Sequence, residues 1–275
     1  MLATFRQIAK HSPLGAAVRW WRRWNAPPAP ALDPVTQQHV NYDRDTVAIL
    51  RRVLSGGKVG VDVGAHAGVI LREMLAAAPD GRHHAFEPIP HLAAKLREEF
   101  PRLRVHQKAL GDEPGADTFL HVVNDPGYSG LRRRDYDRPD PVFEELPVEV
   151  VRLDDVIPPG EDVAFIKLDI EGGEFHALRG ATRTIRRCKP VVVFEAALRS
   201  TGHYGVSAGE LFDLIAGEMG FAVWTLRAWL TGGRPYTRAA FEHNWHNGPE
   251  YYFVAATRTP AQVHILNHVN DFRIS

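Results

Sequence analysis

The chain has 275 residues, of which 33 are basic and 33 acidic, and its formal net charge is zero. This length suits one α/β domain with additions, and the neutral balance gives no global field that would favour nucleic acid or an acidic partner. The single cysteine, Cys188, excludes an internal disulfide, and no apolar run approaches the roughly 18–20 residues of a membrane helix. We therefore expect a cytoplasmic protein without a nucleic-acid partner.

The N-terminal segment, residues 1–24, combines basic residues and tryptophans with no acidic residue. Such a segment can make a peripheral contact with a membrane, or its aromatic side can pack on the domain or on a second subunit of a homo-oligomer. A semi-rigid, proline-rich spacer follows at residues 26–30. We expect an extension with its spacer over residues 1–40, a main domain over 41–260 and a tail over 261–275.

The first predicted strand and the turn after it organise the chain. A helix is expected from Asp45, and valines then favour a strand over residues 59–63. Gly64 marks a sharp turn, and a second helix follows Gly68. The turn reads D-x-G-x-x-x-G, unlike the G-x-G-x-x-G turn that binds pyrophosphate. Asp62, at the strand end, suits a cationic ligand such as an α-amino group.

The second strand, residues 83–86, ends in Glu87, and an acid at this position can accept both hydroxyl protons of a ribose. An amino-acid end on the first turn and a ribose on the second describe S-adenosylmethionine. Residues 103–106 predict a third strand, and the loop at residues 108–112 should border the adenine. Asp112 either bonds the adenine amino group or is a turn aspartate.

Residues 116–152 are strand-like and hold no helix pattern, with strands favoured at 118–123 and 148–151. Between these strands, residues 129–141 form a polar segment rich in arginine. The arginines could hold an anionic part of a substrate or cover the cofactor, or the segment could be a solvated basic loop. They are Arg132, Arg133 and Arg134.

A buried parallel strand is predicted at residues 163–169, acids around two glycines follow it, and one helix is then expected with Phe175, Leu178, Thr182 and Ile185 on one side. Like charges so close together are costly unless they bind something. The next strand, residues 191–194, ends in Glu195. A hard cation such as Mg²⁺ could join Asp169 and Glu195 to a substrate diol. Alternatively, these acids only bond the backbone and a lysine such as Lys167.

The last part of the chain adds two strands. Ser207 and Glu210 predict a capping box for a helix that Gly220 ends. Strands are then expected at residues 222–226 and 251–256. The connection between these strands is a candidate substrate loop.

Four segments resemble the FkbM-type S-adenosylmethionine-dependent methyltransferases, namely residues 61–68, 86–88, 166–174 and 190–195. The resemblance covers roughly residues 45–257, and its most specific part is the fourth-strand motif I-K-L-D-I-E-G-G-E. It implies an α/β fold of the Rossmann-like class I type. This fold has a seven-stranded, mostly parallel sheet with the last strand antiparallel and helices on both faces.

The resemblance also implies which residues bind the cofactor. The turn after the first strand would hold the methionine end of S-adenosylmethionine, Glu87 the ribose, and Ala109 and its neighbours would border the adenine. His66 stands where the family usually has asparagine. The full predicted set is Asp62, Val63, Gly64, Ala65, His66, Gly68, Glu87, Pro88, Ala109, Asp112 and Asp169.

Family members commonly O-methylate sugars or sugar-bearing and polyketide-type natural products, which implies a sugar or glycoside substrate. Methyl transfer to an alcohol needs an aligned nucleophile and removal of its proton. Asp169 is the first candidate for the base, and a histidine is the alternative. The acids around Asp169 are Glu171, Glu174 and Glu195, and the histidines are His203, His243 and His246. The predicted catalytic set is Asp169, Glu171, Glu195 and His243.

Two other functions are compatible with the sequence. A nucleotide-linked oxidoreductase could use the same fold, although the missing G-x-G-x-x-G and the acid at Asp62 count against it. A non-catalytic scaffold could keep the cofactor fold while the basic N-terminus docks a membrane or a partner, because a fold does not imply a function.

Overall fold

The computed structural model describes residues 33–136 and 140–257. The chain divides into two units after Val40, and the second unit holds the sheets and the site described below. The predicted N-terminal segment 1–24, its spacer and the tail 261–275 lie outside the described residues. Among the described helices, none combines the length and the apolar character needed to cross a membrane.

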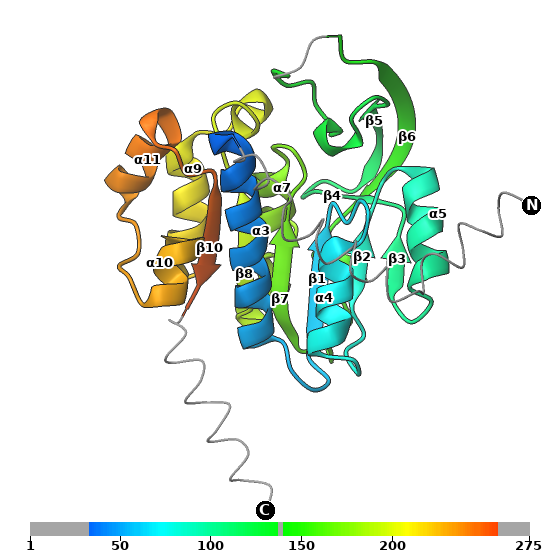
Figure 1. Ribbon diagram of the computed structural model, residues 1–275, viewed down its shortest axis with the longest axis horizontal. Coiled ribbons are helices and arrows are strands. Elements are labelled where there is room, and N and C mark those ends of the chain that lie inside the picture. Colours follow the sequence, from blue (N-terminus) through cyan, green and yellow to red (C-terminus); the bar gives the residue numbers. More distant parts are fainter. Residues whose placement is uncertain (1–32, 137–139, 258–275) are drawn as a thin grey trace, which may run out of the picture. The chain divides into compact units, whose positions relative to one another are not determined.

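The second unit is built on a seven-stranded sheet with the strand order β3-β2-β1-β7-β8-β10-β9 (Figure 1). β10 is antiparallel to both of its neighbours, and the other pairs are parallel. The central strands read as apolar runs because both of their faces are covered. The strands are β1 (Val59–Val63), β2 (His84–Phe86), β3 (Arg104–His106), β7 (Val163–Leu168), β8 (Val191–Glu195), β9 (Ala222–Thr225) and β10 (Tyr252–Ala256). This architecture confirms the predicted fold class.

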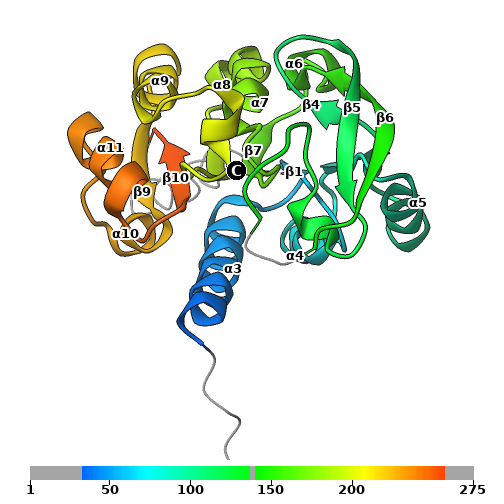
Figure 2. The same cartoon turned by 90° about the horizontal axis from the view of Figure 1, so that it is seen from above.

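Helices cover the sheet in two layers, each with its own apolar core (Figures 1 and 2). One layer contains α3 (Pro34–Val53), α4 (Val69–Ala77), α5 (Pro90–Glu99) and α10 (Leu226–Thr231). The other contains α6 (Leu153–Val156), α7 (Glu174–Arg179), α8 (Thr182–Cys188), α9 (Ala208–Asp213) and α11 (Arg238–Asn247). Because apolar side chains fill both faces of the sheet, polar side chains gather at the ends of its strands.

A second sheet of three strands lies at one end of the main sheet, and α9 to α11 lie at the other end (Figure 2). This second sheet, the accessory sheet, consists of β4 (Ala109–Leu110), β6 (Phe143–Val151) and β5 (Gly115–Val122), in that order. The two strands predicted in this region are confirmed. Residues 109–110, predicted as part of a loop, form a short strand that pairs with β6. Two residues are too few to show a strand period in the sequence.

Three helix predictions need correction. The first helix, α3, begins at Pro34 and not at Asp45, because the carboxylate of Asp33 accepts hydrogen bonds from the first amides of the helix. Residues 174–188 form two helices, α7 and α8, where the sequence predicts one. The break lies at Gly180, where a Cβ atom would overlap the carbonyl oxygen of Gly111. The backbone after β4 therefore packs directly against the backbone at the break. The connection before β10, predicted as a loop, contains α10 and α11, which begin at the side-chain caps of Thr225 and Thr237.

Shorter helical turns follow β5, β8 and α9. The 3₁₀ turn η1 (Pro126–Tyr128) follows β5, and η2 (Thr201–Tyr204) follows β8. The predicted capping box of Ser207 and Glu210 is present at the start of α9. A π-helical turn, η3 (Leu214–Glu218), continues α9 toward β9.

Candidate active site

The turn after β1 is held between its two neighbouring strands. The amides of Gly64 and Ala65 donate to the carbonyl oxygen of Phe86 at 3.0 and 3.2 Å. On the other side, a Cβ atom at Gly64 would overlap the carbonyl oxygen of Asp169 after β7. Gly64 also has a φ of 80°, which favours glycine. The turn therefore needs glycine both for its backbone conformation and for this close approach.

Asp62 lies near the end of β1 and is 1% exposed. Its Oδ1 has no hydrogen-bond partner among the described residues. Burial raises the pKa of its carboxyl group to about 7, although Lys167 on the neighbouring strand β7 opposes this shift. A buried polar atom without a partner is costly unless a ligand satisfies it. Asp62 therefore has a free acceptor atom for an ammonium group.

Glu87 follows β2 and uses both carboxylate oxygens on nearby amides. Its Oε2 accepts a hydrogen bond from the amide of His66 at 2.8 Å, and its Oε1 accepts one from the amide of Ile89 at 2.9 Å. Burial raises the pKa of Glu87 above its ordinary value. Each oxygen has a second lone pair, so the fixed carboxylate can also accept from the two hydroxyl groups of a ribose.

His66 contributes to this arrangement through its backbone. Its side chain is exposed, and its φ of 43° lies in the left-handed region. Asparagine and histidine adopt this region more often than most residues. The asparagine usual in the family and the histidine of this chain therefore meet the same backbone requirement, in which the amide of residue 66 faces Glu87.

Several other predicted cofactor residues have structural tasks. The side chains of Val63 and Ala65 pack in the two apolar cores of the main sheet. Ala109 packs in a third core with the accessory sheet. Gly68 has a φ of 73°, and a Cβ atom there would lie 2.6 Å from the ring of Phe100. These residues shape the cofactor turns without offering a free polar side chain.

Asp112 is held by helix α7. Its carboxylate accepts a hydrogen bond from Nδ1 of His176 at 2.9 Å and forms an ion pair with Arg179 at 3.1 Å. Because both carboxylate oxygens of Asp112 are already bound, a structural role fits this residue better than a hydrogen bond to the adenine amino group. Pro88 is half-buried and separates Glu87 from the Ile89 amide that Glu87 binds.

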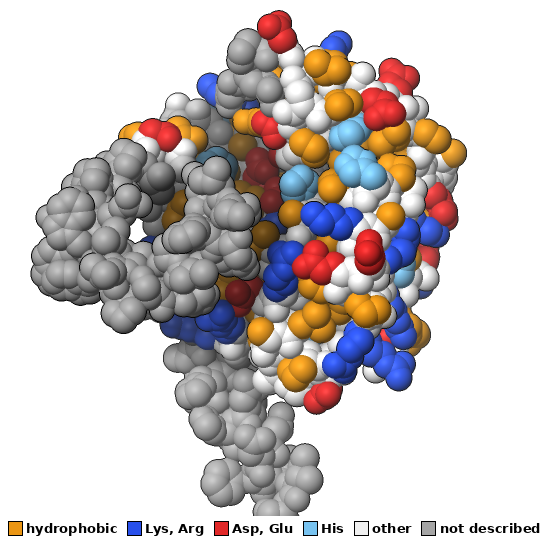
Figure 3. Space-filling view, turned by 45° about the vertical axis from the view of Figure 1, so that its right-hand side comes forward, with side chains coloured by type: hydrophobic (Ala, Val, Ile, Leu, Met, Phe, Trp, Pro, Cys, Tyr) orange, Lys and Arg blue, Asp and Glu red, His pale blue; other side chains and the backbone are white. Residues whose placement is uncertain are grey.

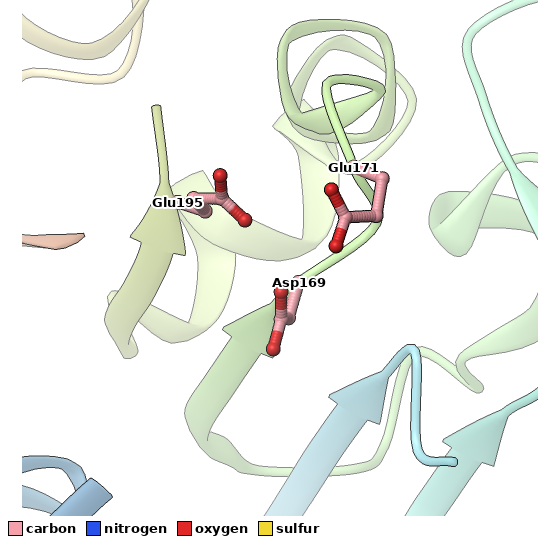
Figure 4. Close-up of side chains that lie close together, drawn as sticks. All are labelled: Asp169, Glu171 and Glu195. Carbon is pink, nitrogen blue, oxygen red and sulfur yellow. The ribbon is translucent and has the colours of Figure 1, made fainter. Parts of the chain in front are cut away.

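Three acids meet at the ends of β7 and β8. Asp169 follows β7, Glu171 lies in the loop before α7, and Glu195 ends β8; their side chains point toward one another (Figure 4). One carboxylate oxygen from each lies within 4.8 Å of the others. Acidic side chains are also visible in a hollow of the molecular surface (Figure 3). The structure thus brings together three of the four predicted catalytic residues.

The pKa values of Asp169 and Glu195 shift in opposite directions because the two acids have different neighbours. Burial alone would raise the pKa of Asp169, but the Lys167 ammonium, 2.7 Å from Oδ2, holds that pKa below its ordinary value. The hydroxyl of Tyr252 also donates to Asp169. Burial and the nearby Asp169 raise the pKa of Glu195 well above its ordinary value. These neighbours therefore favour the ionised form of Asp169 and the protonated form of Glu195.

Glu174 opens α7 and is fully buried. Its Oε1 accepts a hydrogen bond from the amide of Ile170 at 2.9 Å, whereas its Oε2 has no partner among the described residues. Burial raises the pKa of Glu174 to about 7. Glu174 therefore closes the backbone turn after β7 and adds a second titratable carboxyl group beside Asp169.

The sequence did not single out Tyr252 as a site residue. Tyr252 begins β10 and lies in antiparallel register with Glu195, the last residue of β8. Its signal was present in the sequence, because the first residue of an antiparallel last strand must lie beside the carboxyl end of its neighbour. The ring of Tyr42 on α3, 5.0 Å away between centroids, packs on Tyr252.

The three arginines of the segment at residues 129–141 have partners within the chain. Arg134 forms an ion pair with Glu171. Arg132 pairs with Asp117 at 3.0 Å, and Arg133 lies 4.5 Å from the centre of the Phe143 ring. All three arginines therefore interact within the chain instead of being free for an anionic substrate, and Arg134 lies against one of the acids.

The structure does not bring the predicted base His243 to the acids. His243 and His246 are exposed on α11, and no described contact joins either one to the acid cluster. Phe241, Asn244 and Trp245 form the buried side of this helix, and His243 and His246 lie on its exposed side. His203, in η2, lies 3.4 Å from Asp135.

Three comparisons relate the chain to known proteins. Residues 62–223 match the family described as "Methyltransferase FkbM domain", and no curated protein matches the chain. Among solved structures, the chain is similar to the methyltransferase FkbM from Methylobacillus flagellatus KT, with 19% identity and a TM-score of 0.42. This similarity covers 73% of the chain and 44% of that protein, so the chain spans less than half of its length.

Two further structures are similar over most of their length. They are the precorrin-6y C5,15-methyltransferase from Geobacter metallireducens GS-15, with 15% identity and a TM-score of 0.40, and a TehB-like SAM-dependent methyltransferase from Corynebacterium glutamicum ATCC 13032 Kitasato, with 13% identity and a TM-score of 0.40. The first similarity covers 78% of this chain and 86% of the other, and the second covers 80% and 94%.

Proposed function

We propose that the chain, which belongs to the FkbM methyltransferase family, is an S-adenosylmethionine-dependent methyltransferase whose acceptor is a hydroxyl group of a sugar, a glycoside or a related natural product. The observation that supports this acceptor is the cluster of Asp169, Glu171 and Glu195 beside the cofactor turn. The oxygens of these carboxyl groups can accept hydrogen bonds from hydroxyl groups, so the cluster favours a polyhydroxylated acceptor.

The residues of the β1 and β2 turns fit S-adenosylmethionine. Asp62 has a buried oxygen without a partner for the ammonium group, and Glu87 has free lone pairs for the ribose hydroxyls. When bound, S-adenosylmethionine supplies a methyl group activated by its sulfonium. Gly64 brings the cofactor turn against the backbone of Asp169, so the two halves of the site adjoin.

We assign the base to Asp169. Lys167 and Tyr252 donate to its carboxylate, and both interactions favour the ionised form. An ionised carboxylate at this position can orient an acceptor hydroxyl and take its proton during transfer. Such a base contributes roughly 10²–10⁴-fold to a rate, while holding the two reactants together supplies much of the rest.

The predicted Mg²⁺ fits the cluster in ligand type but not in charge. Three carboxyl groups could offer oxygen ligands to a hard cation. However, Lys167 already binds Asp169 and Arg134 already binds Glu171. We therefore derive the reaction without a metal ion.

A mass-shift assay tests the proposed acceptor. The protein is incubated with S-adenosylmethionine and separate panels of sugars, glycosides, phenolic natural products, amines and RNA. We expect one added methyl group on a sugar or glycoside hydroxyl, with no product from the Asp169→Asn variant. Methylation confined to amines or RNA would contradict the proposal. Cofactor binding without turnover on any panel would favour the scaffold alternative.

A further inference from the structure

Two acids of the cluster each have a cationic partner from the chain. Lys167 Nζ lies 2.7 Å from Asp169, and Arg134 forms an ion pair with Glu171. Without these partners, three carboxyl groups with oxygens within 4.8 Å would have the ligand set of a hard divalent cation. Cationic side chains of the chain therefore already occupy two of the three possible ligands.

Arg134 is the partner that comes from outside the main sheet. It lies between β5 and β6, in a segment that hydrogen bonds hold to β5. The amides of Leu120 and Gly130 each donate to the other's carbonyl oxygen, at 2.9 and 3.2 Å. The hydroxyl of Ser129 accepts a hydrogen bond from the amide of Val122 at 2.9 Å. The accessory sheet thus fixes the backbone from which Arg134 reaches the acids.

The burial of Arg134 distinguishes it from its neighbour. Its side chain is 11% exposed, whereas the side chain of Arg132 is 52% exposed and pairs with Asp117 at the surface. The Arg134 guanidinium also lies 5.0 Å from the centre of the Tyr128 ring. Burying a guanidinium is costly unless acids compensate its charge. The acid cluster therefore explains the position of Arg134, which is not that of a solvated surface arginine.

We infer that Arg134 takes the place of a divalent metal ion at the cluster of Asp169, Glu171 and Glu195. Its guanidinium supplies a fixed positive charge next to Glu171 and acts on Glu195 as well. Loss of this side chain would leave the three carboxyl groups close together and short of one cation, which creates a divalent-cation site. The inference rests on the proposed function only for the identity of the acceptor that the cluster binds. The pairing of the acids with Lys167 and Arg134 does not depend on catalysis.

Titration with Mn²⁺, followed by the electron paramagnetic resonance signal of the free ion, tests this inference on the full chain. The proteins are the wild type, Arg134→Ala, Arg134→Gln and the matched control Arg132→Ala, which removes an exposed arginine from the same segment. We expect no saturable binding by the wild type or Arg132→Ala. Each Arg134 variant should bind one Mn²⁺, with an affinity at least about tenfold higher than any residual affinity of the wild type. Adding Glu195→Ala to Arg134→Ala should abolish that binding.

Either of two results would overturn the inference. One is saturable Mn²⁺ binding by the wild type that Glu195→Ala removes, because the acids would then hold a metal with Arg134 in place. The other is a folded Arg134 variant, judged by circular dichroism, that binds Mn²⁺ no better than the wild type. The wild-type titration decides the matter even if both Arg134 variants fail to fold. A failed acceptor screen would leave these titrations unaffected, so the two proposals can fail separately.

Discussion

The two halves of the site are assembled in different ways. In the cofactor half, Glu87 binds the amides of residues 66 and 89, which lie close to it in the sequence or in the adjoining turn. In the acceptor half, Asp169 receives a hydrogen bond from Tyr252 on the last strand, and Glu171 is paired with Arg134 from the accessory sheet. Local motifs therefore build the half that binds a fixed cofactor, and long-range contacts build the half that faces the acceptor.

Replacing Asp169 should produce the largest effect, and it should be confined to the acceptor half. In the Asp169→Asn variant the base is lost, so kcat should fall by roughly 10²–10⁴-fold. The affinity for S-adenosylhomocysteine should change little, because Asp62 and Glu87 are intact. Single-turnover kinetics and calorimetry measure the two quantities.

Asp213→Asn is the matched control for this substitution. Asp213 is also an acid paired with a basic side chain, Arg238 at 3.0 Å, but it is exposed on α9. Its variant should retain the wild-type kcat. A loss of kcat in Asp169→Asn no larger than in Asp213→Asn would show that Asp169 is not the base.

The pH dependence of cofactor binding should follow Asp62. Its raised pKa of about 7 means that the free protein holds a proton there below that pH, whereas an ammonium ligand needs the ionised carboxylate. Affinity for S-adenosylmethionine should therefore weaken by up to about tenfold per pH unit below pH 7. Calorimetry between pH 5.5 and 8.5 should show this slope in the wild type and a flat, weaker profile in Asp62→Asn.

The raised pKa of Asp62 also predicts how the stability of the ligand-free protein depends on pH: stability should fall with rising pH, whereas cofactor affinity should increase. The folded-state pKa of about 7 lies above the ordinary value of 3.8. The contribution of Asp62 to the free energy of unfolding is therefore greatest below about pH 4 and is lost as the pH rises through 7. Without ligand, Asp62→Asn should be more stable than the wild type at pH 8, as measured by urea unfolding. Equal stability of the two proteins at pH 8 would contradict the buried, unpartnered carboxylate.

Replacing Tyr252 should have the smallest effect. Tyr252→Phe removes one donor to Asp169 and leaves Lys167 in place, so kcat should fall by about 2- to 10-fold, the value of one ordinary hydrogen bond. Tyr236→Phe is the control, because its hydroxyl faces Asn244 on α11. If the two variants have equal kcat, Tyr252 does not support the base.

The cofactor half was predictable because its determinants are local. A strand, a glycine turn and an acid after the next strand are visible in consecutive residues, and Asp62, Gly64 and Glu87 lie where the sequence places them. The seven-stranded, mostly parallel sheet with an antiparallel last strand followed from the family resemblance. Apolar runs showed the remaining strands, because both faces of the sheet are covered.

The rest of the site depended on pairings that the sequence does not show. The two-residue strand β4 and the break at Gly180 exist because distant backbones meet. Arg134 sits among three arginines that look alike in the sequence, and only the folded accessory sheet separates the buried one from the exposed ones. His243 was a candidate by residue type alone, and helix α11 carries it away from the acids.

Calorimetric titration with S-adenosylhomocysteine into Glu87→Ala and Asp169→Asn tests the division of the site most directly. Glu87 holds the ribose end in this account, so its variant should bind roughly 10- to 100-fold more weakly than the wild type. Asp169→Asn should bind within a few-fold of the wild type. Equal losses in the two variants, or no binding by the wild type, would contradict a cofactor half at β1 and β2 that is separate from an acceptor half at β7 and β8.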